Sequence, residues 1–502
     1  MNIIIQAGGR GSRLRHLTWN KPKCLVSFDG EPILFKLFKK FSGNKFYVIG
    51  DYHFDVLKNY IELNASEHDV TVIKASGNGT TSGIAQAMDI IDDNNPCLIL
   101  WSDLIIGKSQ DLKNITNPTI FTTDDFVCRW SVVNGRLVEK TSSSEGVAGI
   151  FYLPSVESMP RPPKSGEFVR WLSTINNVNF DFVNWPNLSE MGDFHKIEEK
   201  NEISNFARFF NNLKITNEIV IKTNRVKEYQ NLIDREINWY KAISNLGFKR
   251  IPKLIEETPF TLQKIDGDHA FNMLDLSERE KGTVIINVID SLKEMHSLES
   301  IPSKHQDFEN VYKDKTINRV NSICKLIPNF NSKTFTINGE KCRNFFAEDV
   351  EEIFSEFLNN ITSRQYQSIH GDPTLSNIIV DKYLRPWFID PRGYFVKEGV
   401  HGDPLYDFAK LYYSTVGGYD SINRKKFKIY INSNVIEVLY DKPILCDKAE
   451  AIFKAEFDTR ELREIKIIHA LIWYALSGYA KDDIDTILAA FYLGTYWMNK
   501  AL

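Results

Sequence analysis

The first hundred residues alternate short apolar runs with amphipathic stretches. Four runs rich in β-branched and aromatic side chains have the length of buried strands: 2–6, 45–50, 69–74 and 97–101. Three stretches between them have the spacing of amphipathic helices: 32–41, 52–64 and 82–91. Strands that alternate with helices favour a mostly parallel sheet with its chemistry at the carboxyl ends of the strands. The pattern therefore predicts an α/β domain at the start of the chain.

The pattern changes near residue 126. Three further strands are predicted without helices between them, as a meander beside the first sheet: 129–133, 136–140 and 147–153. A proline-rich loop at 160–164 precedes a predicted helix at 168–175. Residues 192–209 complete this part of the chain, which places a domain boundary near residue 205.

A second arrangement begins after that boundary. Predicted strands at 218–222 and 261–265 flank a helix at 229–246, and a long amphipathic helix follows at 283–298. The chain after residue 400 is predicted to be largely helical, notably at 449–457, 461–479 and 483–500. We therefore predict two domains, 1–205 and 206–502, the second with a small sheet-bearing part followed by a helical part.

Composition excludes several classes of function. A chain of 502 residues exceeds one ordinary domain. Lys and Arg number 61 against 65 Asp and Glu, so the formal charge is 61 − 65 = −4, which argues against a broad nucleic-acid-binding face. The 6 cysteines form no CxxC pair, which indicates neither a zinc site nor a disulfide framework and favours a reducing compartment.

The chain lacks the charged-then-apolar pattern of a signal peptide at its start. No apolar stretch approaches the roughly 18 residues that would span a bilayer. We therefore expect a cytoplasmic protein with small-molecule partners, without nucleic acid and without direct membrane insertion. A homo-oligomer remains open.

A glycine-rich turn follows the first predicted strand. Gly8, Gly9, Gly11 and Ser12 lack bulky side chains, so their backbone N–H groups can approach phosphate oxygens closely. The turn is neither a Walker A loop nor the spaced GxGxxG of dinucleotide-binding proteins. Two cations follow it, and a folded loop could bring both onto a triphosphate: Arg13 and Lys23.

The segment Gly8–Leu14 followed by Pro22-Lys23 resembles the signature of the sugar-phosphate and phosphocholine nucleotidyltransferase family, GGxGxRL followed by PK. Ser12 stands where that family often has Thr, and His16 replaces a Pro. The resemblance covers about residues 1–200. It implies a Rossmann-like, GT-A-like sheet domain in which an acceptor phosphate attacks the α-phosphorus of a nucleoside triphosphate and releases pyrophosphate.

The same resemblance assigns further residues. It implies that Asp103 binds Mg²⁺ and that Asp193 supplies a second metal carboxylate, although the GT that follows this Asp in the family is absent here. Mg²⁺, Arg13 and Lys23 would offset the charge that develops in the reaction. The remaining implied contacts are to the nucleotide, by Gly79 and Ser82, and to the acceptor, by Glu139, Lys140 and Gly149.

A second motif begins at His370. His370-Gly371-Asp372 followed by Asn377 has the HxDxxxxN spacing of a kinase catalytic loop. Asp372 is placed to accept the proton of a substrate hydroxyl, and Asn377 to bind Mg²⁺. Asp390 ends an apolar strand thirteen residues later, where the metal-binding Asp of kinases is expected.

This region resembles the aminoglycoside phosphotransferase and choline kinase superfamily, because it has HGD in place of HRD and the GDPxxD segment Gly402–Asp407. The resemblance covers about residues 206–500 and implies a two-lobed, protein-kinase-like fold. It implies that Lys222 holds the ATP phosphates and that Glu236 pairs with it, although Lys214 or Glu228 could serve instead. A clear glycine-rich loop over the phosphates is not found.

Together the two motifs predict a bifunctional enzyme that phosphorylates a small alcohol or sugar with ATP and couples the product to a second nucleoside triphosphate. The product would be a precursor of a surface polysaccharide. CTP with choline, ethanolamine or a polyol is the favoured substrate pair, and a sugar 1-phosphate with UTP or GTP is the alternative. Another hypothesis makes only the nucleotidyltransferase half catalytic and the other half regulatory or scaffolding.

Overall fold

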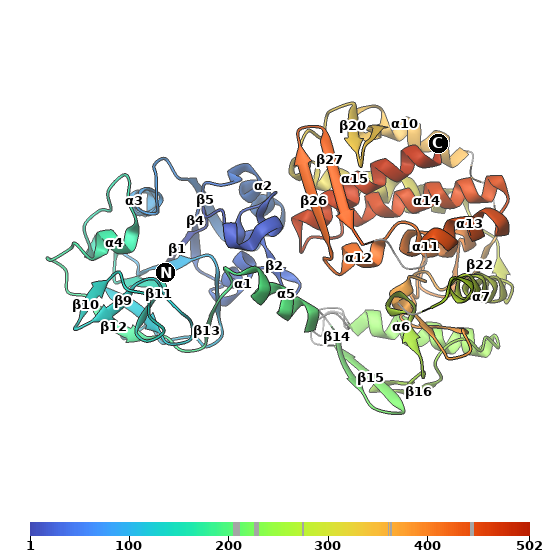
Figure 1. Ribbon diagram of the computed structural model, residues 1–502, viewed down its shortest axis with the longest axis horizontal. Helices are drawn as coiled ribbons and strands as arrows, with labels where there is room; N and C mark the ends of the chain where they lie inside the picture. The colour runs from blue at the N-terminus through green and yellow to red at the C-terminus, as the bar shows by residue number, and fades with distance from the viewer. Residues whose placement is uncertain (204–210, 225–229, 274–275, 360, 362–363, 442–445) are drawn as a thin grey trace. The chain divides into compact units, whose positions relative to one another are not determined.

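The computed structural model of the chain describes residues 1–203, 211–224, 230–273, 276–359, 361, 364–441 and 446–502. Its α/β architecture, which confirms the predicted fold class, falls into two compact units (Figure 1). Unit 1 comprises Met1–Ile203 and Lys481–Ile484, and unit 2 comprises Ser204–Ala480 and Asp485–Leu502.

Unit 1 is built on a mixed sheet in the order β10-β9-β11-β6-β1-β4-β5. Its parallel part has the predicted strand bounds: β1 (Asn2–Gln6), β4 (Lys45–Gly50), β5 (Asp69–Lys74) and β6 (Cys97–Trp101). The antiparallel part contains β8 (Thr119–Thr123), β9 (Ser131–Val133), β10 (Arg136–Val138) and β11 (Gly146–Leu153), and β12 (Asp181–Asn184) pairs in parallel with β8. The carboxyl ends of β1 and β6 lie side by side, because Gln6 is in register with Trp101.

Helices α1 (Ile33–Lys40), α2 (Phe54–Asn64) and α3 (Thr81–Ile90) follow the predicted periodicity. The smaller elements of unit 1 are α4 (Phe168–Leu172), α5 (Phe194–Ile203), β2 (Ser27–Phe28), β3 (Glu31–Pro32), β7 (Leu104–Ile106) and β13 (Leu188–Glu190). Gly83 explains how closely α3 packs on the sheet, because a Cβ there would lie 2.2 Å from Ile49 Cγ2. Ile4, Ile84 and Ile99 are fully buried in the resulting core.

Unit 2 begins with a sheet in the order β14-β15-β17-β16. Helix α6 (Gln230–Asn245) packs against this sheet. Its strands are β14 (Asn211–Ile215), β15 (Ile219–Asn224), β16 (Leu254–Glu257) and β17 (Phe260–Gln263). A small sheet carries the predicted catalytic segments: β18 (Asp268–His269), β23 (Ile378–Val380) and β24 (Pro386–Phe388). Another is formed by β19 (Ser300–Ile301), β22 (Tyr366–Ser368) and β25 (His401–Gly402).

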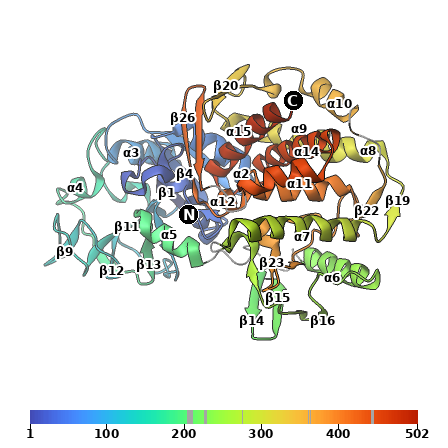
Figure 2. The ribbon, with the colours of Figure 1, turned by 45° about the vertical axis from the view of Figure 1, so that its right-hand side comes forward.

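The helical part of unit 2 packs α11 (Pro404–Thr415) against α14 (Thr459–Ser477), and α14 in turn against α9 (Lys315–Ser322), as Figure 2 shows. A capping box of Ser277 and Glu280 starts α7 (Glu278–His296), because each side chain accepts a backbone N–H of the other residue. The other helices are α8 (His305–Phe308), α10 (Val350–Asn359), α12 (Tyr419–Asn423), α13 (Cys446–Glu456) and α15 (Ile484–Ala501).

The expectation that the chain is largely helical after residue 400 is wrong for one segment. Residues Phe427–Asn432 (β26) and Val435–Tyr440 (β27) form a hairpin, joined in a sheet by β20 (Thr334–Ile337) and β21 (Glu340–Arg343). Alternate side chains of the hairpin are buried, among them Ile429 and Val438, which is the two-residue period of a strand. None of the helices in the described part of the chain has the length and apolar character needed to cross a bilayer.

Candidate functional site

The glycine-rich turn of unit 1 folds directly against Lys23. Gly11 has φ +68°, and a Cβ there would lie 2.8 Å from Lys23 Cβ. A Cβ on Gly9 would lie 3.0 Å from Lys23 Cε, and one on Gly8 would lie 3.0 Å from Asp51 Cβ. Glycine is therefore required at these positions, because a side chain would collide with Lys23 or Asp51. The absence of a side chain also lets phosphate oxygens approach the backbone N–H groups. Ser12 begins the 3₁₀ turn Ser12–Thr18 that follows.

Lys23 and Asp103 meet at the carboxyl edge of the sheet. The Lys23 Nζ lies 2.5 Å from Asp103 Oδ2, and both side chains are largely buried. Asp103 follows the end of β6, beside the glycine-rich turn that follows β1. Two neighbouring buried atoms, Gln6 Oε1 and Ser102 Oγ, have no hydrogen-bond partner among the described residues. This edge of the sheet thus combines a lysine ammonium group, a carboxylate and two buried polar atoms that have no hydrogen-bond partner among the described residues.

Arg13 is paired with a carboxylate that the sequence motifs do not include. Its Nη2 lies 3.1 Å from Glu190 Oε1, and the Arg13 side chain is 68% exposed. Glu190 ends β13, which pairs with β7 directly after Asp103, and the Met191 N–H donates to the Asp103 carbonyl over 2.8 Å. Strand pairing between distant segments therefore brings Glu190 to this edge, which no local spacing could indicate.

Asp193 lies two residues after Met191, whose N–H bonds to the Asp103 carbonyl, and the Asp193 carboxylate has a structural partner. Its Oδ1 accepts the N–H of His195 over 3.0 Å at the start of α5. No group of three or more His, Cys, Asp and Glu side chains within the described ranges is arranged to hold a metal ion. Mg²⁺ needs only one or two carboxylates when substrate phosphates complete its oxygen ligands.

Gly79 lies in the loop before α3 and Ser82 in the first turn of that helix, and this segment is hydrogen-bonded to a second loop. Gly79 has φ +86°, and a Cβ there would lie 2.2 Å from the Gly166 carbonyl oxygen. That oxygen accepts the N–H groups of Thr80 and Thr81 over 2.9 and 3.2 Å. Ser82 is buried, and its Oγ accepts the Gly77 N–H over 3.0 Å. These hydrogen bonds within the protein therefore fix the conformation of residues 77–82.

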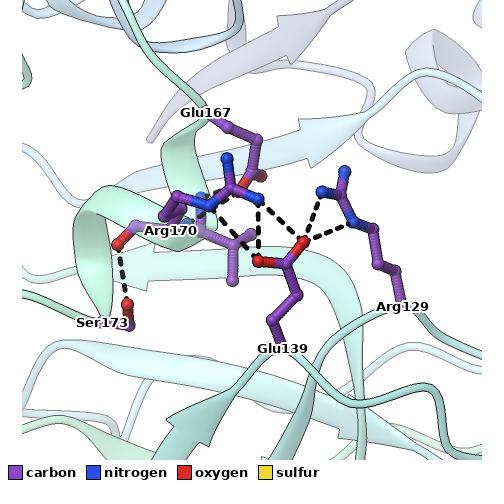
Figure 3. Close-up of polar contacts among 6 residues, drawn as sticks. Arg129, Glu139, Glu167, Arg170 and Ser173 are labelled. Carbon is purple, nitrogen blue, oxygen red and sulfur yellow. Dashed lines mark hydrogen bonds and ion pairs between the residues drawn. The ribbon is translucent and has the colours of Figure 1, made fainter.

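Glu139 lies between two arginines, as Figure 3 shows. The Arg129 Nε donates to Glu139 Oε1 over 3.0 Å, and the Arg170 Nη2 donates to Glu139 Oε2 over 2.7 Å. Arg170 and then Arg129 hold the pKa of this carboxyl below its usual value. Lys140 is exposed beside it, with its backbone N–H bonded to Val138. Among the described contacts none joins Glu139 or Lys140 to the Lys23–Asp103 pair.

Gly149 lies nearer to that pair. It has φ +80° at an irregularity in β11, and a Cβ there would lie 2.3 Å from Trp101 Cδ1. Trp101 ends β6, two residues before Asp103. The structure therefore places Gly149 at the same edge of the sheet, where its lack of a side chain leaves room for the indole.

In unit 2 the HGD segment is held by Asp407 of α11. Asp407 is fully buried and accepts the backbone N–H groups of His370 and Gly371 over 2.8 and 2.7 Å. Its Oδ2 also lies 3.1 Å from His296 Nε2 on α7. These contacts explain physically why an Asp at the end of the GDPxxD segment accompanies the HGD loop.

His370 links the catalytic loop to the strand that precedes Asp390. Its Nε2 lies 3.0 Å from the Ile389 carbonyl oxygen, and its Nδ1 lies 3.2 Å from the Asp372 nitrogen. A neutral ring satisfies both contacts, since Nε2–H donates to the carbonyl while Nδ1 accepts the amide proton. Burial lowers the pKa of His370, in agreement with the neutral form.

Asp372 has different neighbours on its two carboxylate oxygens. The Asn377 Nδ2 donates to Asp372 Oδ2 over 3.2 Å and to the Asp372 carbonyl over 2.9 Å. This orientation leaves the amide oxygen of Asn377 for a metal. The Lys410 Nζ lies 2.9 Å from Asp372 Oδ1. Lys410 comes from α11 and belongs to no motif used in the sequence analysis.

Lys222, Glu236 and Asp390 form a compact charged group. The Lys222 Nζ lies 2.6 Å from Glu236 Oε2 and 2.8 Å from Asp390 Oδ1. Burial lowers the pKa of Lys222, but the two carboxylates outweigh it and the net pKa is raised. The alternative Lys214 is exposed, and the alternative Glu228 lies outside the described residues. The Ile389 N–H donates to the Asn377 carbonyl over 3.0 Å, which places both predicted metal ligands side by side.

Comparisons with known proteins agree with the two sets of motifs. Residues 2–125 match the nucleotidyl transferase family, and residues 203–426 match the phosphotransferase enzyme family. The chain thus contains one segment similar to each of these two families. Both resemblances inferred from the sequence are thereby confirmed.

Individual relatives are similar to part of the chain. CTP:phosphoglutamine cytidylyltransferase of Campylobacter jejuni is 30% identical over 141 residues, which are 26% of this chain and 56% of that protein. The mannose-1-phosphate guanylyltransferase catalytic subunit beta of Dictyostelium discoideum is 28% identical over 111 residues, 21% of this chain and 31% of that protein. The chain thus spans about half, or less, of the length of these curated relatives.

A solved structure of HddC from Yersinia pseudotuberculosis, complexed with GMP-PN, is similar over 40% of this chain and 98% of its own. The TM-score of this match is 0.33 and the sequence identity is 21%.

Proposed function

We propose that the chain is a bifunctional enzyme in which unit 2 phosphorylates a small alcohol or sugar with ATP and unit 1 couples the product to a second nucleoside triphosphate. One observation carries this proposal. In each unit the lysine predicted to bind phosphate is ion-paired with a carboxylate predicted to bind Mg²⁺: Lys23 with Asp103, and Lys222 with Asp390. Phosphoryl and nucleotidyl transfer both require this combination.

In unit 2 the acceptor hydroxyl would lie against Asp372, which takes its proton as the oxygen attacks the γ-phosphorus and ADP leaves. Asn377 and Asp390 would hold Mg²⁺, which neutralises the phosphate charge when bound. Lys222 would bind the ATP phosphates while Glu236 keeps it in place. His370 positions Asp372 through the backbone and stays neutral throughout.

In unit 1 the glycine-rich turn, Arg13 and Lys23 would bind the triphosphate, and a phosphate oxygen of the acceptor would attack the α-phosphorus. Pyrophosphate leaves, and no protein nucleophile is needed. Asp103 with Asp193 would hold Mg²⁺. The cytidylyltransferase relative supports CTP as the nucleotide, and the guanylyltransferase relative keeps GTP as the alternative.

The proposal includes an order and a setting. Unit 2 acts first because its phosphorylated product supplies the phosphate that unit 1 uses, and joining both units in one chain raises the local supply of that product. We propose a functional boundary near residue 205, a cytoplasmic location, and a nucleotide-activated product used for a surface polysaccharide.

A paired assay tests this function. The full chain is supplied with ATP and a panel of alcohols, and ADP release is measured. Pyrophosphate release is then measured with CTP, UTP or GTP and a panel of phosphorylated acceptors. Both releases are expected, and pyrophosphate release should depend on the product of the first reaction. ADP release without pyrophosphate release, or the reverse, would contradict the bifunctional proposal and favour one catalytic half beside a regulatory one.

A further inference from the structure

A cluster of cations surrounds the predicted catalytic base of unit 2. It contains Lys315 and Arg319 of α9, Arg392 of the loop after Asp390, and Lys410 of α11. Lys315 and Arg319 are four residues apart in the helix and therefore share a face. We refer to these side chains as the cationic cluster. No sequence motif discussed above includes any of them.

The cluster borders the side of Asp372 that faces away from the predicted metal ligand. Lys410 binds Asp372 Oδ1 over 2.9 Å, whereas Asn377 binds Oδ2. Arg392 packs beneath the catalytic loop, because a Cβ on Gly371 would lie 2.8 Å from Arg392 Cβ. The nucleotide side of the site already has its own cation, Lys222. The cationic cluster therefore lies where the acceptor alcohol must approach.

The carboxylate of Asp372 balances only part of the positive charge of the cluster. It pairs with Lys410 and also attracts Arg392, whereas the described ion pairs join no carboxylate to Lys315, Arg319 or Arg392. Burial, and then Arg392, Arg319 and Lys410, lower the pKa of Lys315 to about 6, so this side chain is mostly neutral at pH 7 and becomes charged when an anion lies beside it. Partly buried like charges that repel one another are costly unless an anion offsets them.

The aromatic rings beside the cationic cluster are already in contact with its cations. Arg392 lies over Tyr394 at 4.3 Å and over Tyr406 at 5.5 Å, and the Tyr406 hydroxyl is 2.8 Å from Arg392 Nη1. Lys410 lies over Tyr413 at 5.1 Å, and other pairs are Lys410 with Tyr419 and Arg319 with Tyr479. A quaternary ammonium would need such ring faces and would meet positive charge there.

We propose that the acceptor of unit 2 carries an anionic group, a carboxylate or a phosphate monoester, which the cationic cluster binds while the hydroxyl is held at Asp372. This inference rests on the proposed kinase function and narrows its substrate class. It disfavours choline and ethanolamine, which the sequence analysis favoured together with polyols. The guanidinium groups of the cluster suit an anionic acceptor, because they bind carboxylate and phosphate oxygens through two hydrogen bonds at once.

The test compares matched alcohols on the full chain with ATP. The sets are glycerol, glycerate and glycerol 3-phosphate; glucose, glucuronate and glucose 6-phosphate; and choline as a cation. We expect kcat/KM for ADP release to be about ten- to hundred-fold higher for an anionic compound than for its neutral counterpart. The carboxylate and phosphate arms identify which anion is used. Equal or faster turnover of the neutral or cationic compounds would overturn the inference.

Two variants assign the effect to the cluster. Arg319→Gln and Lys315→Gln should raise KM for the anionic acceptor, leave KM for ATP unchanged and reduce the preference for anionic over neutral compounds. Lys341→Gln removes an exposed lysine of β21 in the same unit and should change none of these values. A rise in KM for ATP alone would overturn the inference and assign the cluster to the nucleotide.

Calorimetry separates this inference from the kinase proposal. Binding of glycerate and glycerol 3-phosphate to the full chain needs no turnover. Binding that is weakened by Arg319→Gln, with no ADP release from any alcohol, would overturn the kinase activity and support the anion site. ADP release from alcohols without any anion preference would support the kinase and overturn the anion site.

Discussion

Lys222 of unit 2 is 8% exposed and lies between two carboxylates, whereas in unit 1 Lys23 meets one carboxylate and Arg13 is 68% exposed. The kinase-like site is held by contacts within the protein: Asp407 fastens the catalytic loop and His370 connects it to the strand before Asp390. The transferase-like site has fewer such contacts. We infer that the proposed site of unit 2 is organised without its substrates, while the proposed nucleotide and metal would complete the arrangement in unit 1.

The largest expected effect is at Asp372, the proposed catalytic base of unit 2. Asp372→Asn should lower the rate of ADP release by about 10²–10⁴-fold, because the variant cannot accept the hydroxyl proton. Pyrophosphate release from a phosphorylated acceptor that is added directly should be unchanged. ADP release at the wild-type rate would show that Asp372 is not the base.

Lys23→Gln tests the proposed nucleotide site of unit 1. Loss of a positive charge at the triphosphate should lower the rate of pyrophosphate release by about 10²–10³-fold, and ADP release should not change. Lys39→Gln on α1, whose side chain is 65% exposed, is the matched control in the same unit. An equal loss in both variants would point to the net charge of unit 1 and not to Lys23.

Asp407→Ala tests whether protein contacts organise unit 2. The change leaves two buried backbone N–H groups without an acceptor, which should lower the free energy of unfolding of unit 2 by about 3 kcal/mol. Urea unfolding measures the loss, and amide hydrogen exchange locates it at residues 366–380. The control Glu398→Ala removes a carboxylate that is 63% exposed and should have little effect. Unchanged exchange in the Asp407 variant would show that the loop is held by other contacts.

His469 tests how the stability of unit 2 depends on pH. Burial lowers its pKa to about 3, while its Nε2 accepts the Nε1–H of Trp473 over 2.9 Å. The unfolded chain binds a proton near pH 6.5 and the folded chain does not, so stability is lost as pH falls from 6.5 towards 3. The loss should be up to about 1.4 kcal/mol per pH unit. His469→Gln keeps an acceptor without titrating, and equal pH dependence of both proteins would contradict the assignment.

The smallest effect is expected at the exposed pair of unit 1. Glu190→Gln removes the partner of Arg13, and exposed ion pairs contribute at most about 1 kcal/mol to stability. Thermal unfolding should therefore hardly change, while KM for the nucleotide should fall because Arg13 is released for the phosphates. A large loss of stability would show that the unit 1 site is as firmly held as that of unit 2.

Local patterns identified the elements and motifs that depend on neighbouring residues. The bounds of β1, β4, β5 and β6 follow from apolar runs, and Asp372 and Asn377 follow from their spacing in one loop. Glu190 could not be identified in this way, because strand pairing brings it to the site from a distant segment. Arg392 and Lys410 lie close in sequence to Asp390 and Asp407 but belong to neither motif, and only the folded chain shows that they approach Asp372. The hairpin of β26 and β27 was missed because its alternation is short and follows a helical region.

Under the proposed nucleotide-binding role of Gly79, its contact with Gly166 limits how nucleotide preference could be altered by engineering. The two loops are 87 positions apart in the chain, yet the Gly166 carbonyl oxygen would collide with any side chain at Gly79. Phe168 N–H also donates to Thr80 Oγ1 over 2.8 Å, so the partners continue beyond the glycines. A loop exchange that aims at a different base would have to transplant residues 77–82 and 164–168 together, as a single cassette.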